Sequence, residues 1–127
     1  MRRQLVLLAL AGSSLGLAGA ASAQERACLM EGSITIGGQR TEMKDCLQNN
    51  GIPQDQFKQT CSSLSDIAVT LGGEPAKITY LASCPMPAQG SCEGFFGRPM
   101  TSMYYKRDAK LLADSKSSCL AQGGKWK

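Results

Sequence analysis

Alternating polar and apolar residues predict several short strands. Ser33–Ile36 alternates before a pair of glycines, and Lys77–Leu81 is rich in β-branched and aromatic residues. Cys92–Phe96 and Met100–Lys106 predict two further strands, with a turn at Gly97–Pro99 between them. Strands of this length with close turns favour a small antiparallel sheet.

Capping residues and 3.6-residue spacing predict three helices. The first is expected over residues 42–49, between Thr41 as N-cap and a glycine stop. The second begins near Pro53 and carries Cys61 on its apolar face, so that Cys46 and Cys61 are both expected on helices. The third runs from Ala109 to about Gln122, after Asp108 as N-cap and before two glycines.

Together these elements predict an α+β fold, a small antiparallel sheet covered by short helices from both ends of the chain. Residues 24–127 are long enough for one domain of this kind. A core of that size gains stability from covalent cross-links, so we expect up to three disulfides.

The first 23 residues resemble an export signal. Two arginines precede an apolar run from Leu5 to about Leu17, and Ala21–Ala23 fits a small-x-small cleavage site. The apolar run is too short to span a bilayer, which takes roughly 20 apolar residues. We therefore expect residues 1–23 to be removed, leaving a periplasmic or secreted protein of a bacterial envelope without a membrane span.

Six cysteines follow this signal, an even number that is typical of disulfides in an oxidising compartment: Cys28, Cys46, Cys61, Cys84, Cys92 and Cys119. Cys84 and Cys92 flank a loop with two prolines and a glycine, and we expect them to pair. The other four pair either as Cys46–Cys61 with Cys28–Cys119, or as Cys28–Cys46 with Cys61–Cys119. Spacing alone does not choose between these alternatives.

The chain contains no histidine, which excludes Ser-His-Asp and Cys-His catalysis and histidine-ligated metals. It has no Cys-x-x-Cys redox motif and no phosphate-binding glycine loop. Met86, Met100 and Met103 suggest a Cu(I) site only weakly, because Met100 and Met103 would face opposite sides of a strand. We expect no cofactor and no metal, and a protein that is not an enzyme. The alternative is a small hydrolase of cell-wall polysaccharide that uses two carboxylates, for which Glu74 and Glu93 are the candidates.

Charge and aromatic residues gather in the last third of the chain. Residues 94–127 contain seven basic and two acidic residues, whereas residues 24–93 contain five basic and eight acidic ones. Arginine and aromatic side chains dominate binding hot spots, so the candidate partner-binding residues are Arg98, Tyr105, Lys106 and Arg107. The expected function is that of a small exported binding protein, one version of which is an inhibitor or immunity-like protein. Its partner would be a protein or an anionic envelope component and not nucleic acid.

Overall fold

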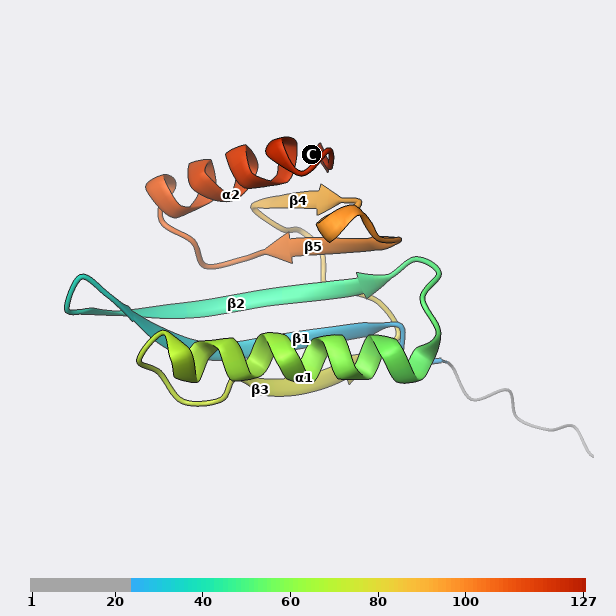
Figure 1. Ribbon diagram of the computed structural model, residues 1–127, viewed down its shortest axis with the longest axis horizontal. Helices are drawn as coiled ribbons and strands as arrows, with labels where there is room; N and C mark the ends of the chain where they lie inside the picture. The colour runs from blue at the N-terminus through green and yellow to red at the C-terminus, as the bar shows by residue number, and fades with distance from the viewer. Residues whose placement is uncertain (1–23) are drawn as a thin grey trace, which may run out of the picture.

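A six-stranded antiparallel sheet forms the frame of the protein, and two helices pack on it (Figure 1). The structure is a computed structural model that describes residues 24–127. The predicted export signal, residues 1–23, lies outside the described residues. The strand order across the sheet is β3-β1-β2-β5-β4-β6. In chain order the elements are β1 (Ala27–Ile36), β2 (Gln39–Asn49), α1 (Gln54–Thr70), β3 (Lys77–Leu81), β4 (Gly90–Glu93), a 3-10 turn (Phe95–Gly97), β5 (Met100–Tyr104), α2 (Ala109–Ala121) and β6 (Lys125–Trp126). The predicted α+β class is confirmed.

The helix predicted over residues 42–49 is wrong, because this segment belongs to strand β2. β2 pairs with β1 over ten positions, from Ile36 opposite Gln39 to Ala27 opposite Gln48. The residues that suggested a helix end form a turn instead, in which the Asn49 side chain accepts hydrogen bonds from the N–H groups that follow it. The pairing of β2 with β1 along the whole hairpin therefore outweighs the local signals that favour a helix.

Both helices cover the same face of the sheet. Cys28 of β1, Leu47 of β2, Ser102 of β5 and Cys92 of β4 are direct cross-strand neighbours, so their side chains share one face. Cys28 is bonded to Cys61 of α1, and Cys92 is bonded to Cys119 of α2. Each helix is thus attached covalently to this face, which we call the helix face.

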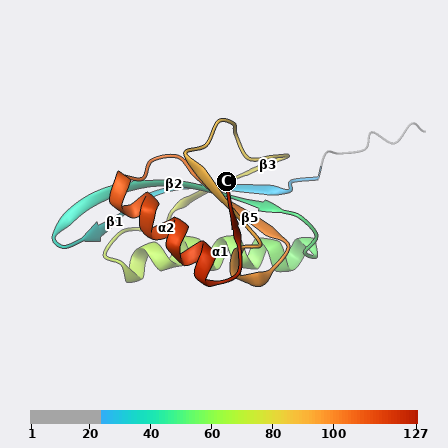
Figure 2. The ribbon, with the colours of Figure 1, turned by 90° about the horizontal axis from the view of Figure 1, so that it is seen from above.

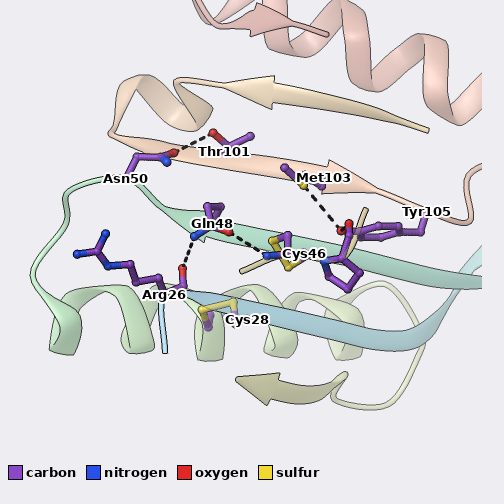
Figure 3. The surroundings of a disulfide bond; sticks show 11 residues. Arg26, Cys28, Cys46, Gln48, Asn50, Thr101, Met103 and Tyr105 are labelled. Atoms are coloured by element: carbon purple, nitrogen blue, oxygen red, sulfur yellow. Dashed lines mark hydrogen bonds between the residues drawn. A yellow bond between two sulfur atoms is a disulfide. The ribbon is translucent and has the colours of Figure 1, made fainter. Parts of the chain in front are cut away.

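The third disulfide, Cys46–Cys84, lies on the opposite face of the sheet (Figure 3). Cys46 is adjacent to Leu47 in β2, so it points away from the helices. The loop that carries Cys84 lies on this side, away from α1 (Figure 2). The predicted pair Cys84–Cys92 is therefore wrong, because Cys92 faces the helices. The other proposed pairings are wrong too, since each helix cysteine is bonded to the strand beneath its helix.

The apolar core lies between α1 and the sheet. Phe57 and Cys61 of α1 are fully buried against Cys28 and Leu47, and Met100 closes the cluster. Burying a side chain such as Phe or Leu contributes about 1.5–3 kcal/mol each. Helix α2 buries less of its surface against the sheet than α1, because Cys119 is its only buried residue.

Both ends of α2 and the end of α1 lie at residues whose type explains them. Asp108 caps α2 as predicted, since its carboxylate accepts the N–H of Leu111 at 2.8 Å. Gly123 follows with a positive φ of 80°, as helix stops often require. At the end of α1, a Cβ on Gly73 would collide with the carbonyl oxygen of Ser33, so only glycine fits there. No helix among residues 24–127 is long and apolar enough to cross a membrane.

Candidate functional site: a groove between the two helices

A groove of about 410 Å³ runs along the helix face between α1 and α2. Helix α1 packs on β1 and β3, whereas α2 packs on β4 and β6, which leaves β2 and β5 between them (Figure 1). Four strand spacings of about 4.8 Å place the helix axes roughly 19 Å apart, whereas helices in contact lie about 8–10 Å apart. The two helices therefore do not close over the middle of the sheet.

The wall formed by α1 and the neighbouring floor are apolar. Leu64 and Ile67 of α1 line the groove together with Leu71, the residue that follows the helix, and Met43 lines it from β2. Ile67 and Leu71 remain 47% and 46% exposed, although they lie on the side of α1 that borders the groove. Half-exposed apolar residues that surround a concave surface are typical of a binding site.

Phe96 stands at the edge of the groove in a strained conformation. Its φ is 55°, and it is the only non-glycine residue with positive φ among residues 24–127. This conformation costs about 1–2 kcal/mol for a residue with a side chain. Phe96 is 56% exposed, whereas the neighbouring Phe95 packs against the core. A strained, exposed aromatic residue is better explained by binding than by folding.

An ion pair forms the polar part of the floor. The Arg107 guanidinium donates from Nη2 to Asp45 Oδ2 at 2.8 Å and from Nη1 to Ser115 Oγ at 2.6 Å. It also lies over the ring of Tyr104, 4.2 Å from the centroid, and Trp126 stacks on the same tyrosine. Burial raises the pKa of Asp45 above its usual value, and the hydrogen bond and charge of Arg107 offset this only in part.

The wall formed by α2 is mostly polar, and its charges are compensated. Ser115, Ser118 and Gln122 line it, and Asp114 is paired with Lys110 at 2.9 Å. With Arg107 neutralised by Asp45, the groove offers one apolar wall, one polar wall and no uncompensated charge among these residues. Such a lining suits an uncharged ligand or segment with an apolar side.

The four residues predicted to bind a partner do not form one patch. Arg107 lies in the groove with only 18% of its side chain exposed, so the expectation of an exposed arginine fails at this position. Arg98 is exposed and donates to the Gln56 side chain of α1. Tyr105 and Lys106 follow β5, and Tyr105 packs beside the Cys46–Cys84 disulfide on the face opposite the helices.

The basic character of the last third is largely compensated in the fold. Four of its seven basic side chains, those of Lys106, Arg107, Lys110 and Lys127, form ion pairs. Surface ion pairs of this kind contribute little stability, but they reduce the positive field of the region. The net positive field of this region is therefore smaller than its composition alone indicates.

The two candidate catalytic carboxylates are far apart. Glu93 lies on β4 and pairs with Lys127 at 2.7 Å, while Glu74 follows Gly73 beside β1. Three strand spacings separate β1 from β4, about 14 Å, which exceeds the roughly 5–9.5 Å between the carboxyl groups of glycosidases. Met100 and Met103 face opposite sides of β5, as predicted. Within residues 24–127, no group of three Cys, Asp or Glu side chains could hold a metal ion.

Sequence reasoning missed Asp45 and Ile67 as groove residues. The predicted helix over residues 42–49 includes Asp45, whereas in strand β2 Asp45 shares the helix face with Met43 and Leu47. An acid at an inward position of a strand would have signalled a functional or paired carboxylate. Ile67 could not be identified from the sequence, because its local pattern does not show whether the side chain faces the groove or packs against another element.

Comparisons with known proteins leave the function to be argued from this geometry. No family model matches the chain, and neither the curated proteins nor the solved structures yield a match.

Proposed function

We propose that the chain is a small exported binding protein of the bacterial envelope, without catalytic activity, and that the groove between α1 and α2 is its binding site. The observation that carries this proposal is Phe96. Its backbone strain has no benefit for the core, and its exposed ring stands at the edge of the one apolar groove described above. Strain that persists at an exposed aromatic residue is expected where a ligand uses it.

The ligand is best described as an uncharged apolar molecule, or the apolar side of a partner's chain. It would contact Ile67, Leu71 and Phe96 with its apolar side and the serines of α2 with its polar groups. A charged ligand would have to compete with the existing Asp45–Arg107 pair for partners. This favours a protein or other uncharged partner over the anionic envelope component that composition suggested.

Three disulfides support the location outside the cytosol, because such bonds persist in oxidising compartments. The export signal over residues 1–23 belongs to the same proposal. The strand spacing argues against the hydrolase alternative, because it separates the two candidate carboxylates by more than glycosidases use. The version in which the protein inhibits or neutralises an envelope enzyme is compatible with the groove as the contact surface.

The test uses residues 24–127 and the uncharged fluorescent probe N-phenyl-1-naphthylamine, whose emission rises in apolar sites. Phe96→Asn removes the ring, while asparagine tolerates positive φ better than most residues. Leu120→Gln is the matched control, because Leu120 is equally exposed but lies on α2 outside the groove.

We expect Phe96→Asn to weaken probe binding about tenfold or more, the equivalent of roughly 1.4 kcal/mol of lost apolar contact. Its stability towards urea should be unchanged or up to about 1 kcal/mol higher, because the strain is relieved. Leu120→Gln should bind as the unmodified protein does. The proposal is contradicted if the protein does not bind the probe, or if both variants bind it equally well.

A further inference from the structure

The loop between β3 and β4 holds one methionine away from the rest of the protein. Met86 lies between Pro85 and Pro87 and is 74% exposed, more than any other large apolar residue among residues 24–127. The loop lies on the side of the sheet away from α1 and therefore away from the groove (Figure 2). An exposed thioether contributes little to the core, and its sulfur is open to reagents in solvent.

Both ends of this loop are fixed to the sheet. Cys84 is bonded to Cys46 of β2, and its N–H donates to the Gln48 side chain at 2.9 Å (Figure 3). The Tyr105 hydroxyl donates to the carbonyl of Pro85 at 2.8 Å. These contacts, together with the fixed φ of the prolines, keep the tip from folding back over its own sulfur.

At the far end, the Gln89 side chain accepts the N–H of Arg107 and donates to the carbonyl of the same residue. The Gln89 N–H also donates to the carbonyl of Tyr104. The loop is therefore pinned on both sides of Met86 by the strand β5 region and by the disulfide. A reaction at the tip leaves all of these contacts in place.

The other sulfur atoms are protected. All six cysteines are in disulfides. Met100 is buried, and the remaining described methionines, Met30, Met43 and Met103, are half-buried. Met103 lies on the same side of the sheet as the loop, and its sulfur lies 3.8 Å from the Tyr105 hydroxyl oxygen (Figure 3). Susceptibility to oxidation follows exposure, so Met86 is the first target for an oxidant that attacks sulfur.

We propose that Met86 is a modification site, which hydrogen peroxide or a related peroxide oxidises to the sulfoxide while the protein remains folded. The sulfur lone pair takes one oxygen atom, the O–O bond of the peroxide breaks, and hydrogen peroxide leaves as water. Sulfur loses two electrons and the peroxide gains them. A thiol-dependent methionine sulfoxide reductase reverses the change, converting a polar tip back to an apolar one.

The test treats folded residues 24–127 with dilute hydrogen peroxide and follows each methionine by peptide mass spectrometry. Met86 should be oxidised about tenfold faster than Met103 or more, in line with the dependence on exposure. Met86→Leu should slow the first oxidation of the protein by the same factor, and the matched control Met103→Leu should leave it unchanged. Methionine sulfoxide reductases A and B should together restore Met86 in the folded protein.

Oxidation of Met86 should change neither the near-ultraviolet circular dichroism nor the binding of N-phenyl-1-naphthylamine in the groove. This separates the proposal from the proposed function, because the two sites lie on opposite faces. The proposal is overturned if Met43 or Met103 reacts as fast as Met86, if oxidation of Met86 unfolds the protein, or if the reductases fail on the folded form.

Discussion

Removing the Cys92–Cys119 disulfide should detach helix α2 while leaving the rest of the fold in place. This bond joins α2 to β4, and Cys119 is the only fully buried residue of the helix. Gly124 packs directly on the two sulfurs, so the bond also positions the chain that leads to β6. Helix α1, by contrast, buries four residues and keeps its packing on β1. The double variant Cys92→Ala/Cys119→Ala therefore acts mainly on one wall of the groove.

The expected loss of stability follows from the length of the loop that the disulfide closes. The two cysteines are separated by 27 residues. Closing a loop of that length lowers the entropy of the unfolded chain by the equivalent of about 3.6 kcal/mol at 25 °C. The loss of the two buried sulfur atoms adds on the order of 1 kcal/mol. A domain of this size has a total stability of about 5–15 kcal/mol, so the variant should still fold.

The assay combines urea unfolding with amide hydrogen exchange. We expect the free energy of unfolding to fall by about 3–5 kcal/mol, from the two terms above. Amides of α2 should lose protection, amides of α1 and β1 should keep theirs, and probe binding in the groove should be lost. The matched control is Cys46→Ala/Cys84→Ala, which removes a longer loop closure on the opposite face and should leave α2 protected. A loss below about 1 kcal/mol together with unchanged protection of α2 would refute this reasoning.

Three further changes test individual contacts. Burial raises the pKa of Asp45, so its contribution to stability is fully present below the unfolded pKa of 3.8 and is lost as pH rises through the folded pKa. The unfolding free energy of the protein, measured relative to Asp45→Asn, should therefore decline as pH rises above about 4. An increase over the same range would contradict this. Gly90→Ala should cost about 1–3 kcal/mol and alter Trp126 fluorescence, because a Cβ at this position collides with the indole ring; an unchanged urea midpoint and spectrum would speak against the packing. Tyr105→Phe should cost about 1 kcal/mol in urea unfolding through the lost hydrogen bond to Pro85, and a neutral result would show that the loop does not need it.

Local signals predicted part of this fold well. Asp108 and Gly123 mark the ends of α2, and the apolar face around Cys61 marks α1, because capping and amphipathic packing act within a few residues. The same kind of signal failed at residues 42–49. There the deciding interaction is the pairing with β1, which no window of this length contains.

The disulfides and the groove depend on tertiary structure in the same way. The correct pairing requires knowing that Cys92 faces the helices and Cys46 faces the other side, which follows only from the register of the sheet. The sequence places Phe96 at the end of a predicted strand, whereas in the structure a turn with positive φ presents its ring to solvent. Sequence composition identified a basic end, yet it could not show that Arg107 meets Asp45 across 62 positions of the chain.

The most direct test of the groove as the binding site is a two-dimensional ¹⁵N–¹H NMR titration of residues 24–127 with N-phenyl-1-naphthylamine. We expect the amide shifts to concentrate on both walls and the floor, at Met43, Ile67, Phe96, Leu111 and Ser115. Shifts confined to the face that carries the Cys46–Cys84 disulfide, or no shifts at saturating probe, would contradict the account.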